Sequence, residues 1–177
     1  MKKNISGIIV ECLQGDIAAQ QDIDAVVNAA NAWLRPGGGV AGAIHRAAGP
    51  QLYQECKGLA PIKPGQAVIT KAYNLPNKYV IHCLGPVYGR DEPADKQLAD
   101  CYRNALRLAE QNQIASIAFP AISTGVFGYP IREAARVAIK TIVEIIPELK
   151  SVKRIRLVLY STSDLKIYEE LLQSLYS

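Results

Sequence analysis

The sequence predicts an α/β fold, in which a largely parallel sheet is covered by helices on both faces. Two observations predict it: short apolar runs of strand character recur along the chain, and amphipathic segments lie between the later runs. Alternation of this kind is typical of parallel sheets, because a crossover helix returns the chain to the end where the previous strand began. The predicted strands are Ile5–Leu13, Ala25–Val27, Ala67–Thr70, Tyr79–Cys83, Ile117–Phe119 and Ile155–Tyr160.

Apolar side chains recur at helical spacing in three longer segments. In Ala94–Gln111 they fall on one face at intervals of three and four residues, and Pro93 suits the start of that helix. The same pattern predicts helices over Pro130–Ile146 and Asp164–Tyr176, and Ala43–Ala48 is a shorter stretch of helical character.

The composition predicts one globular domain over residues 1–177. Hydrophobic residues make up 49% and charged residues 20% of the chain, which is ordinary for a soluble protein. No apolar run approaches the roughly 18 residues that a membrane span needs. We therefore expect a cytoplasmic protein with no targeting segment and no membrane partner. The four cysteines lack C-x-x-C spacing, so buried free thiols are expected and a metal site is not.

Two glycine-rich loops carry the strongest functional signal. Pro36–Gly42 runs into the first helical stretch, and Ser123–Gly128 lies between a predicted strand and a predicted helix. Unhindered backbone N–H groups at the start of a helix favour an anion, because the helix dipole is positive there. Two such loops predict a ligand with two linked phosphates, held from both sides.

A dinucleotide-binding fold is an alternative that the context excludes. Gly37, Gly39 and Gly42 satisfy G-x-G-x-x-G, but Asn28–Pro36 separates them from the preceding strand. No second strand ending in an acidic residue follows at the usual distance. The sequence also lacks G-x-x-x-x-G-K-[ST], which argues against a P-loop NTPase.

Several polar and aromatic residues near these loops have two interpretations each. Asp16 suits a helix N-cap or a carboxylate that accepts from an exocyclic amine. Asn28 and Asn31 suit a turn or a pair of ribose hydroxyls. Phe127 could pack at the core edge or stack on a sugar, and Tyr160 could anchor the last helix or flank a base.

Neither histidine has a serine or cysteine placed beside it as a nucleophile. We therefore interpret His45 and His82 as structural, with His82 buried and neutral. The net charge of +4 suits an anionic ligand. Nucleic acid is not an expected partner, because the basic residues near the last strand have no interleaved aromatics; these residues are Lys150, Lys153, Arg154 and Arg156.

Taken together, the motifs resemble a macrodomain of the MacroD type, in order and along nearly the whole chain. The resemblance rests on Gly15-Asp16-Ile17, Val27–Asn31, Gly37–Val40, Ala43–Pro50, Ile81-His82, Gly85-Pro86 and Ile122–Pro130. It implies a three-layer α/β/α fold with a mixed, mostly parallel central sheet. It also implies a cleft for ADP-ribose or O-acetyl-ADP-ribose, mono-ADP-ribosylated proteins as partners, and no cofactor or metal.

The resemblance also implies roles for individual residues. Asp16 would bind the adenine amine, Ile17 would offer a backbone N–H nearby, and Tyr160 would lie against adenine. Asn28 and Asn31 are candidate ribose contacts, with Asn31 positioning the distal ribose for catalysis and Gly39 in the loop that positions phosphate and water. The diphosphate would lie between Gly37, Gly38, Gly39 and Val40 on one side and Ser123, Thr124, Gly125, Val126 and Phe127 on the other.

Two positions depart from the hydrolytic pattern. Similar enzymes commonly have an aspartate where this chain has Ala41, and often a tyrosine where it has Phe127. Alanine has no proton acceptor, so a carboxylate-assisted route is closed here. Three hypotheses follow: a hydrolase for ADP-ribosyl esters or O-acetyl-ADP-ribose, a non-catalytic reader of ADP-ribose, and a binder of RNA or poly-ADP-ribose through the basic flank.

Overall fold

The computed structural model describes residues 1–176, and its centre is one seven-stranded mixed sheet. The strands lie in the order β1-β2-β7-β6-β3-β5-β4, and the five inner strands are parallel to one another. The two outer strands run antiparallel to their neighbours. The predicted mixed, mostly parallel sheet is therefore confirmed. The strands are β1 Lys2–Ile5, β2 Ile8–Gln14, β3 Ala25–Ala29, β4 Ala67–Lys71, β5 Tyr79–Cys83, β6 Ser116–Phe119 and β7 Arg154–Leu159.

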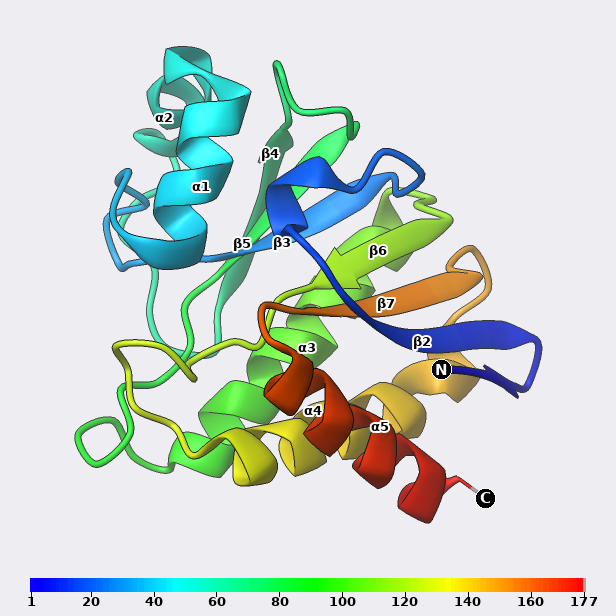
Figure 1. Cartoon of the computed structure of the whole chain (residues 1–177). Coiled ribbons are helices and arrows are strands. Elements are labelled where there is room, and N and C mark those ends of the chain that lie inside the picture. The colour runs from blue at the N-terminus through cyan, green and yellow to red at the C-terminus, as the bar shows by residue number, and fades with distance from the viewer. Residues whose placement is uncertain (177) are drawn as a thin grey trace.

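Helices cover both faces of the sheet, which gives three layers (Figure 1). Two helices pack on one face and three on the other, and a separate apolar cluster fills each interface. The first pair is α1 Gly39–Ala48 and α2 Pro50–Cys56; the other three are α3 Ala94–Gln111, α4 Ile131–Ile145 and α5 Thr162–Leu175. Single turns of 3-10 helix occur at η1 Ile17–Ala19 and η2 Ile146–Glu148.

Two features differ from the sequence-based prediction. The single strand expected over residues 5–13 is wrong: Ser6 and Gly7 have φ of 53° and 88° and form the turn of the β1–β2 hairpin. The first helix begins at Gly39, four residues before the predicted start. Glycine has a low helix propensity, so the sequence does not indicate a helix at this position. The helix ends where Gly49 adopts φ 88°, and Pro50 opens α2 as a separate helix.

The described residues contain no helix long and apolar enough to cross a membrane. All four cysteines are free and buried, as the spacing predicted. Within residues 1–176, no group of three or more histidine, cysteine or acidic side chains could hold a metal ion.

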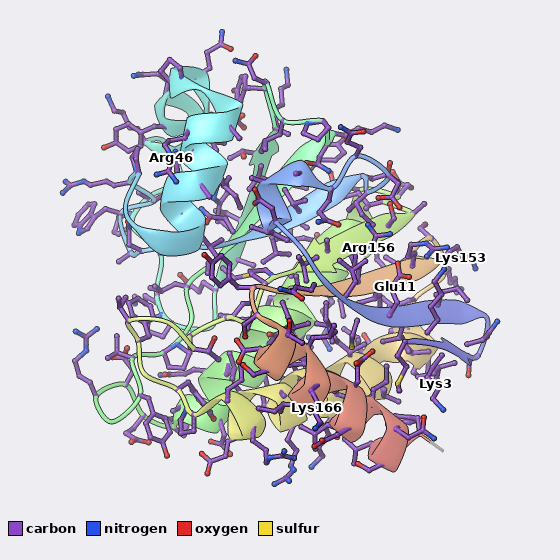
Figure 2. The ribbon with its side chains drawn as sticks, viewed as in Figure 1. Lys3, Glu11, Arg46, Lys153, Arg156 and Lys166 are labelled. Atoms are coloured by element: carbon purple, nitrogen blue, oxygen red, sulfur yellow. The ribbon has the colours of Figure 1, made fainter. Side chains whose placement is uncertain are left out.

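A buried ion-pair network joins β2 to β7 (Figure 2). Glu11 is 3% exposed and accepts from Arg154 Nη1 at 2.8 Å and from Arg156 Nε at 3.0 Å. Arg156 also donates to both carboxylate oxygens of Asp22, each at 2.7 Å. Two cations of the basic flank are therefore paired, which leaves less free charge for a nucleic acid than the sequence suggests.

The network makes stability depend on pH. Hydrogen bonds from Arg156 lower the pKa of Asp22 to about 2. Burial raises the pKa of Glu11, but hydrogen bonds from Arg154 and Arg156 outweigh it and leave that pKa below its ordinary value. Both carboxylates therefore stabilise the fold above their unfolded pKa values, near pH 4, and this contribution is lost as pH falls through their lowered folded-state pKa values, which for Asp22 is about 2.

We expect Arg156→Met to lower the free energy of unfolding at pH 7 by about 2 kcal/mol, since Arg154 still pairs with Glu11. Urea unfolding at pH 7 and pH 3 measures the effect. Wild type should lose more stability than the variant between these two pH values. An equal loss in both proteins would contradict the assignment of the pH dependence to Arg156.

Candidate functional site

The predicted site residues follow four neighbouring parallel strands. In the sheet these strands lie in the order β2, β7, β6, β3, so their carboxyl ends meet at one edge. Residues 15–17 follow β2, Tyr160 follows β7, loop 121–128 follows β6, and residues 30–40 follow β3. Ligands of parallel α/β sheets collect at this edge. Figure 1 shows the loop after β6 and the start of α1 on the same side of the molecule.

The two glycine loops converge on one apolar cluster. Val40 comes from the first loop and Phe127 from the second, and both are partly buried against it. The buried Ile17 and Val158, from the β2 and β7 side, belong to the same cluster. Residues more than a hundred positions apart in the chain therefore pack on one apolar cluster.

Asp16 combines the two interpretations that the sequence left open. It is the N-cap of η1, and its Oδ1 accepts from the Ala18 backbone N–H at 2.8 Å. The side chain is exposed, and among the described residues Oδ2 has no hydrogen-bond partner. The cap fixes the carboxylate in one orientation and leaves its second oxygen for a ligand.

Two hydrogen bonds in series, from Arg156 to Gln20 and from Gln20 to the Asp16 carbonyl, support the Asp16 loop. Gln20 Nε2 donates to the Asp16 carbonyl at 2.7 Å, and Gln20 Oε1 accepts from Arg156 Nη1 at 2.9 Å. Local sequence patterns do not reveal the hydrogen bond between Arg156 and Gln20, because the two residues lie 136 positions apart in sequence. A buried arginine on a strand needs a partner, and that signal could have revealed the pair.

Tyr160 lies beside the Asp16 loop, since β2 and β7 are paired. Its side chain is 91% exposed, and its carbonyl accepts from Gln14 Nε2 at 3.3 Å. An exposed ring held by its backbone is suited to stacking. Val126, at the tip of the second glycine loop, is 99% exposed.

Asn28 and Asn31 have different surroundings. Asn28 is 1% exposed, and its Nδ2 contacts His82 Nδ1 at 3.1 Å. This differs from the direct ribose contact that we expected, because the strand directs the Asn28 side chain into the interior. Asn31 is half-buried, and its amide bridges Arg35: Nδ2 donates to the Arg35 carbonyl at 2.8 Å and Oδ1 accepts from the Arg35 N–H at 2.9 Å.

The first glycine loop opens α1. Gly38 is the N-cap, and Gly39 has φ 55°, a backbone conformation that favours glycine. A Cβ on Gly42 would collide with the Gly37 carbonyl oxygen, so this position requires glycine as well. The first-turn N–H groups of Gly39, Val40 and Ala41 have no acceptor within the helix, and N–H groups at a helix start favour an anion.

The second glycine loop is held by its own backbone. Gly128 N donates to the Gly125 carbonyl at 3.0 Å, and Tyr129 N donates to the Ser123 carbonyl at 2.9 Å. Ser123 has φ 68°, is 6% exposed, and its Oγ lies against Gly85, where a Cβ would collide with it. Thr124 Oγ1 donates to the Ala121 carbonyl at 2.8 Å. The two hydroxyls are therefore turned away from the loop surface, which leaves backbone groups to face a ligand.

His82 is buried and neutral, as the sequence predicted, whereas neither ring nitrogen of the buried His45 has a hydrogen-bond partner among the described residues. His82 is fully buried, with Thr70 Oγ1 at 2.9 Å from its Nε2, and burial lowers its pKa to about 3. Burial also lowers the pKa of His45. Both imidazoles are neutral at pH 7. Cys56 Sγ lies 3.7 Å from His82 Nε2, but burial raises the pKa of that thiol to about 11, so it is not a thiolate nucleophile.

A family model, the Macro domain, matches residues 27–138 of this chain. The chain belongs to the macro domain family. Its sequence is 47% identical over 169 residues to an O-acetyl-ADP-ribose deacetylase of Klebsiella pneumoniae, covering 93% of this chain and 96% of that protein. It is 46% identical over 170 residues to the ADP-ribose glycohydrolase MACROD2 of Xenopus laevis, covering 94% of this chain but 40% of that longer protein.

Solved macrodomains share the fold. The Oceanobacillus iheyensis macrodomain with ADP superposes with a TM-score of 0.95 at 42% identity, covering 99% of this chain and 95% of that one. The Trypanosoma brucei macrodomain in complex with ADP-ribose gives 0.83 at 38% identity, covering 91% and 68%. The resemblance to macrodomains and the three-layer fold that it implied are confirmed.

The adenine end of this macro domain can be tested with Asp16→Ala. We expect a loss of ADP-ribose affinity of about 1.5–3 kcal/mol, if Oδ2 accepts a hydrogen bond from the adenine amine. Calorimetry should also show that the variant no longer prefers ADP-ribose over the hypoxanthine analogue, which lacks the amine. Loss of the η1 cap should cost about 1 kcal/mol of stability, which a parallel unfolding curve measures. Unchanged affinity would mean that adenine binds elsewhere.

Proposed function

We propose that this protein binds ADP-ribose along the four strand ends and hydrolyses mono-ADP-ribosyl esters of acidic side chains, deacetylates O-acetyl-ADP-ribose, or does both. The observation that carries the proposal is the convergence of two glycine loops, from adjacent parallel strands, on one apolar cluster. The names of the Klebsiella and Xenopus relatives, and the ADP and ADP-ribose of the solved macrodomains, support it.

In this proposal, the order of the strands sets how the ligand lies along the edge of the sheet. Adenine would lie at the β2–β7 end, where Asp16, the Ile17 N–H and Tyr160 stand. The diphosphate would lie at the β6–β3 end, between the N–H groups of the two glycine loops. The distal ribose would lie beyond it, near Asn31 and under the Phe127 ring.

Asn31 is suited to hold the distal ribose. A carboxamide has two N–H hydrogens and two lone pairs on its oxygen, and the Arg35 backbone uses one of each. One N–H and one lone pair remain for hydroxyls, on a side chain already fixed in orientation. That preorganisation favours positioning of the ribose, since its orientation need not be established during the reaction.

In ester hydrolysis a water oxygen bonds to the anomeric carbon of the distal ribose, and the bond from that carbon to the carboxylate oxygen breaks. The protein's aspartate or glutamate leaves as a carboxylate, and the water proton passes to a ligand phosphate or to solvent. In deacetylation the water oxygen bonds to the acetyl carbonyl carbon instead, the bond from that carbon to the ribose oxygen breaks, acetate leaves, and the ribose oxygen takes up a proton. Ala41 cannot accept a proton, so the glycine loop around Gly39 would position the water against the phosphate.

A reader of ADP-ribose without turnover is the second candidate, and Ala41 favours it. The partners of either form would be mono-ADP-ribosylated proteins, in a cytoplasmic single-domain protein that needs no cofactor.

A time course of ADP-ribose release from a glutamate-linked mono-ADP-ribosylated protein separates the two candidates. We expect release by wild type and little or none by Asn31→Ala. If wild type releases nothing at high enzyme concentration while ADP-ribose still raises its Tm, the protein is a reader. If ADP-ribose neither raises the Tm nor is released, the proposed function is wrong.

A further inference from the structure

The segment between the third and fourth strands is strongly asymmetric in charge. From Ala25 to Gln66 it contains four cations, Arg35, Arg46, Lys57 and Lys63, and one acidic residue, Glu55. Glu55 is already engaged, since its Oε1 accepts from the Tyr73 hydroxyl at 2.7 Å and from the Lys71 N–H at 3.1 Å. None of the four cations forms an ion pair with another described residue. The excess positive charge is therefore available to a partner.

One of these cations, Arg46, lines a cavity, and two others lie next to residues that line it. A hollow of about 340 Å³ is lined by Pro36, Gly37, Gly42, His45, Arg46, Gly49, Pro50 and Tyr53. Arg46 lies over Gly42, and Lys57 Nζ lies 5.1 Å from the centre of the Tyr53 ring. Arg35 precedes Pro36 and lies 5.7 Å from the centre of the exposed Trp33 ring. We name Arg35, Arg46, Lys57, Trp33 and Tyr53 the cationic rim.

The cationic rim adjoins the distal end of the proposed ligand. Gly37 lines the cavity and also belongs to the first glycine loop, and the Arg35 backbone is held by Asn31. Whatever is attached to the distal ribose would leave the site beside these residues. Two of the three cations are already held against aromatic rings, which lowers the entropy cost of using them.

We propose that the cationic rim docks the acidic segment of the modified protein that surrounds the ADP-ribosylated residue. The inference rests on the proposed function, in which the modified residue is itself an aspartate or glutamate. Charge complementarity identifies the occupant: unpaired arginine and lysine side chains beside an exposed indole suit carboxylates and the backbone between them. An RNA or poly-ADP-ribose strand would also be attracted by charge, but only three unpaired cations are present here, and one of them lines a hollow.

The test uses two peptides that carry ADP-ribose through a hydrolysis-resistant linkage, so that binding is measured without turnover. One has glutamates on both sides of the modified residue and the other has glutamines. We expect wild type to bind the acidic peptide about five- to tenfold more tightly, since exposed charge pairs each add little. The triple variant Arg35→Gln/Arg46→Gln/Lys57→Gln should bind both peptides equally.

The matched control is Lys3→Gln/Lys153→Gln/Lys166→Gln, which removes the same total charge away from α1, where Arg46 lies (Figure 2). It should keep the preference for the acidic peptide, and free ADP-ribose should bind all three proteins alike. Equal binding of both peptides by wild type overturns the inference, as does an equal loss of preference in the control. Displacement of the acidic peptide by an unmodified RNA oligonucleotide at matched charge would make the cationic rim a nucleic-acid site instead.

Failure of the inference and failure of the proposed function give different results. If the cationic rim does not bind the acidic residues on either side of the modified residue, ADP-ribose still binds and the ester substrate is still cleaved. If the proposed function is wrong, free ADP-ribose itself does not bind, whichever peptide is used.

Discussion

Gly125→Glu should abolish ADP-ribose binding, with a loss of affinity of at least about 1000-fold in calorimetry. The position lies on the second glycine loop, where the proposed diphosphate carries two negative charges. A glutamate there would occupy the phosphate position and would place a third negative charge beside it. Like charges brought together in a binding site cost several kcal/mol, which corresponds to this loss.

The protein itself should tolerate this substitution. Gly125 is exposed, and a Cβ built on it has no heavy atom within 4 Å. Its φ is not among the positive values of this chain, so an L-residue fits the backbone. The Tm should therefore match wild type, and lost affinity would report on the site alone.

Gly125→Gln is the matched control, because it has the same shape without the charge. We expect it to retain more affinity than Gly125→Glu, with the difference reduced at high salt. Unchanged affinity in Gly125→Glu would mean that the diphosphate does not lie on this loop, and the proposed orientation of the ligand would have to be discarded.

Local patterns predicted most of the fold. The three helices on one face were located within two residues at each end, because their apolar faces repeat at helical spacing over 14 to 18 residues. The β1–β2 hairpin was missed although Ser6-Gly7 is a turn dipeptide, because the apolar residues that follow it dominate the pattern and suggest one strand. The start of α1 was missed because glycine has a low helix propensity, and Gly39 is the first residue of the helix.

The glycine loops of the candidate site could be predicted from the sequence, because they would act through backbone groups. Residues whose role depends on the direction of a side chain were harder to predict. Glycine loops that follow predicted strands are visible in sequence, and the sheet order brings them together. Asn28 was expected on the site surface, but it lies in β3 and its amide contacts His82 from the next strand. The partners that orient a buried amide come from register between strands, which a single sequence does not specify.

The contacts between residues far apart in sequence that support the candidate site were not predicted. The Asp16 loop depends on Gln20 and Arg156, and the basic cluster near the last strand is partly neutralised by Glu11. These contacts cross the sheet between β2 and β7, strands separated by most of the chain. Charge counted along the sequence therefore overstates the free charge near β7 and understates it beside α1, where the cations have no ion-pair partners.

Ala41→Asp should raise the rate of ADP-ribose release, by up to about 10²- to 10⁴-fold in kcat, the range typical of a positioned general base. Ala41 is the third residue of α1 and follows Val40, so its side chain starts beside the loop that we assign to the diphosphate and the water. A carboxylate in the first turn is compatible with the helix dipole, which partly offsets its burial at a position only 6% exposed. The wild-type rate is the baseline from which the gain is measured.

Ala41→Asn is the control that distinguishes the effect of a proton acceptor from the effect of a larger side chain. It is nearly isosteric with Ala41→Asp and cannot take a proton near pH 7, so it should leave kcat close to wild type. Ala41→Asp should also add an acidic limb to the pH–rate profile, as the new carboxylate becomes protonated and the gain disappears. A variant that binds ADP-ribose as wild type does, unfolds at a similar Tm and gains no rate would contradict the prediction. In that case Ala41 would not face the attacking water, and Asn31 with the phosphate-positioned water would account for whatever activity the chain has.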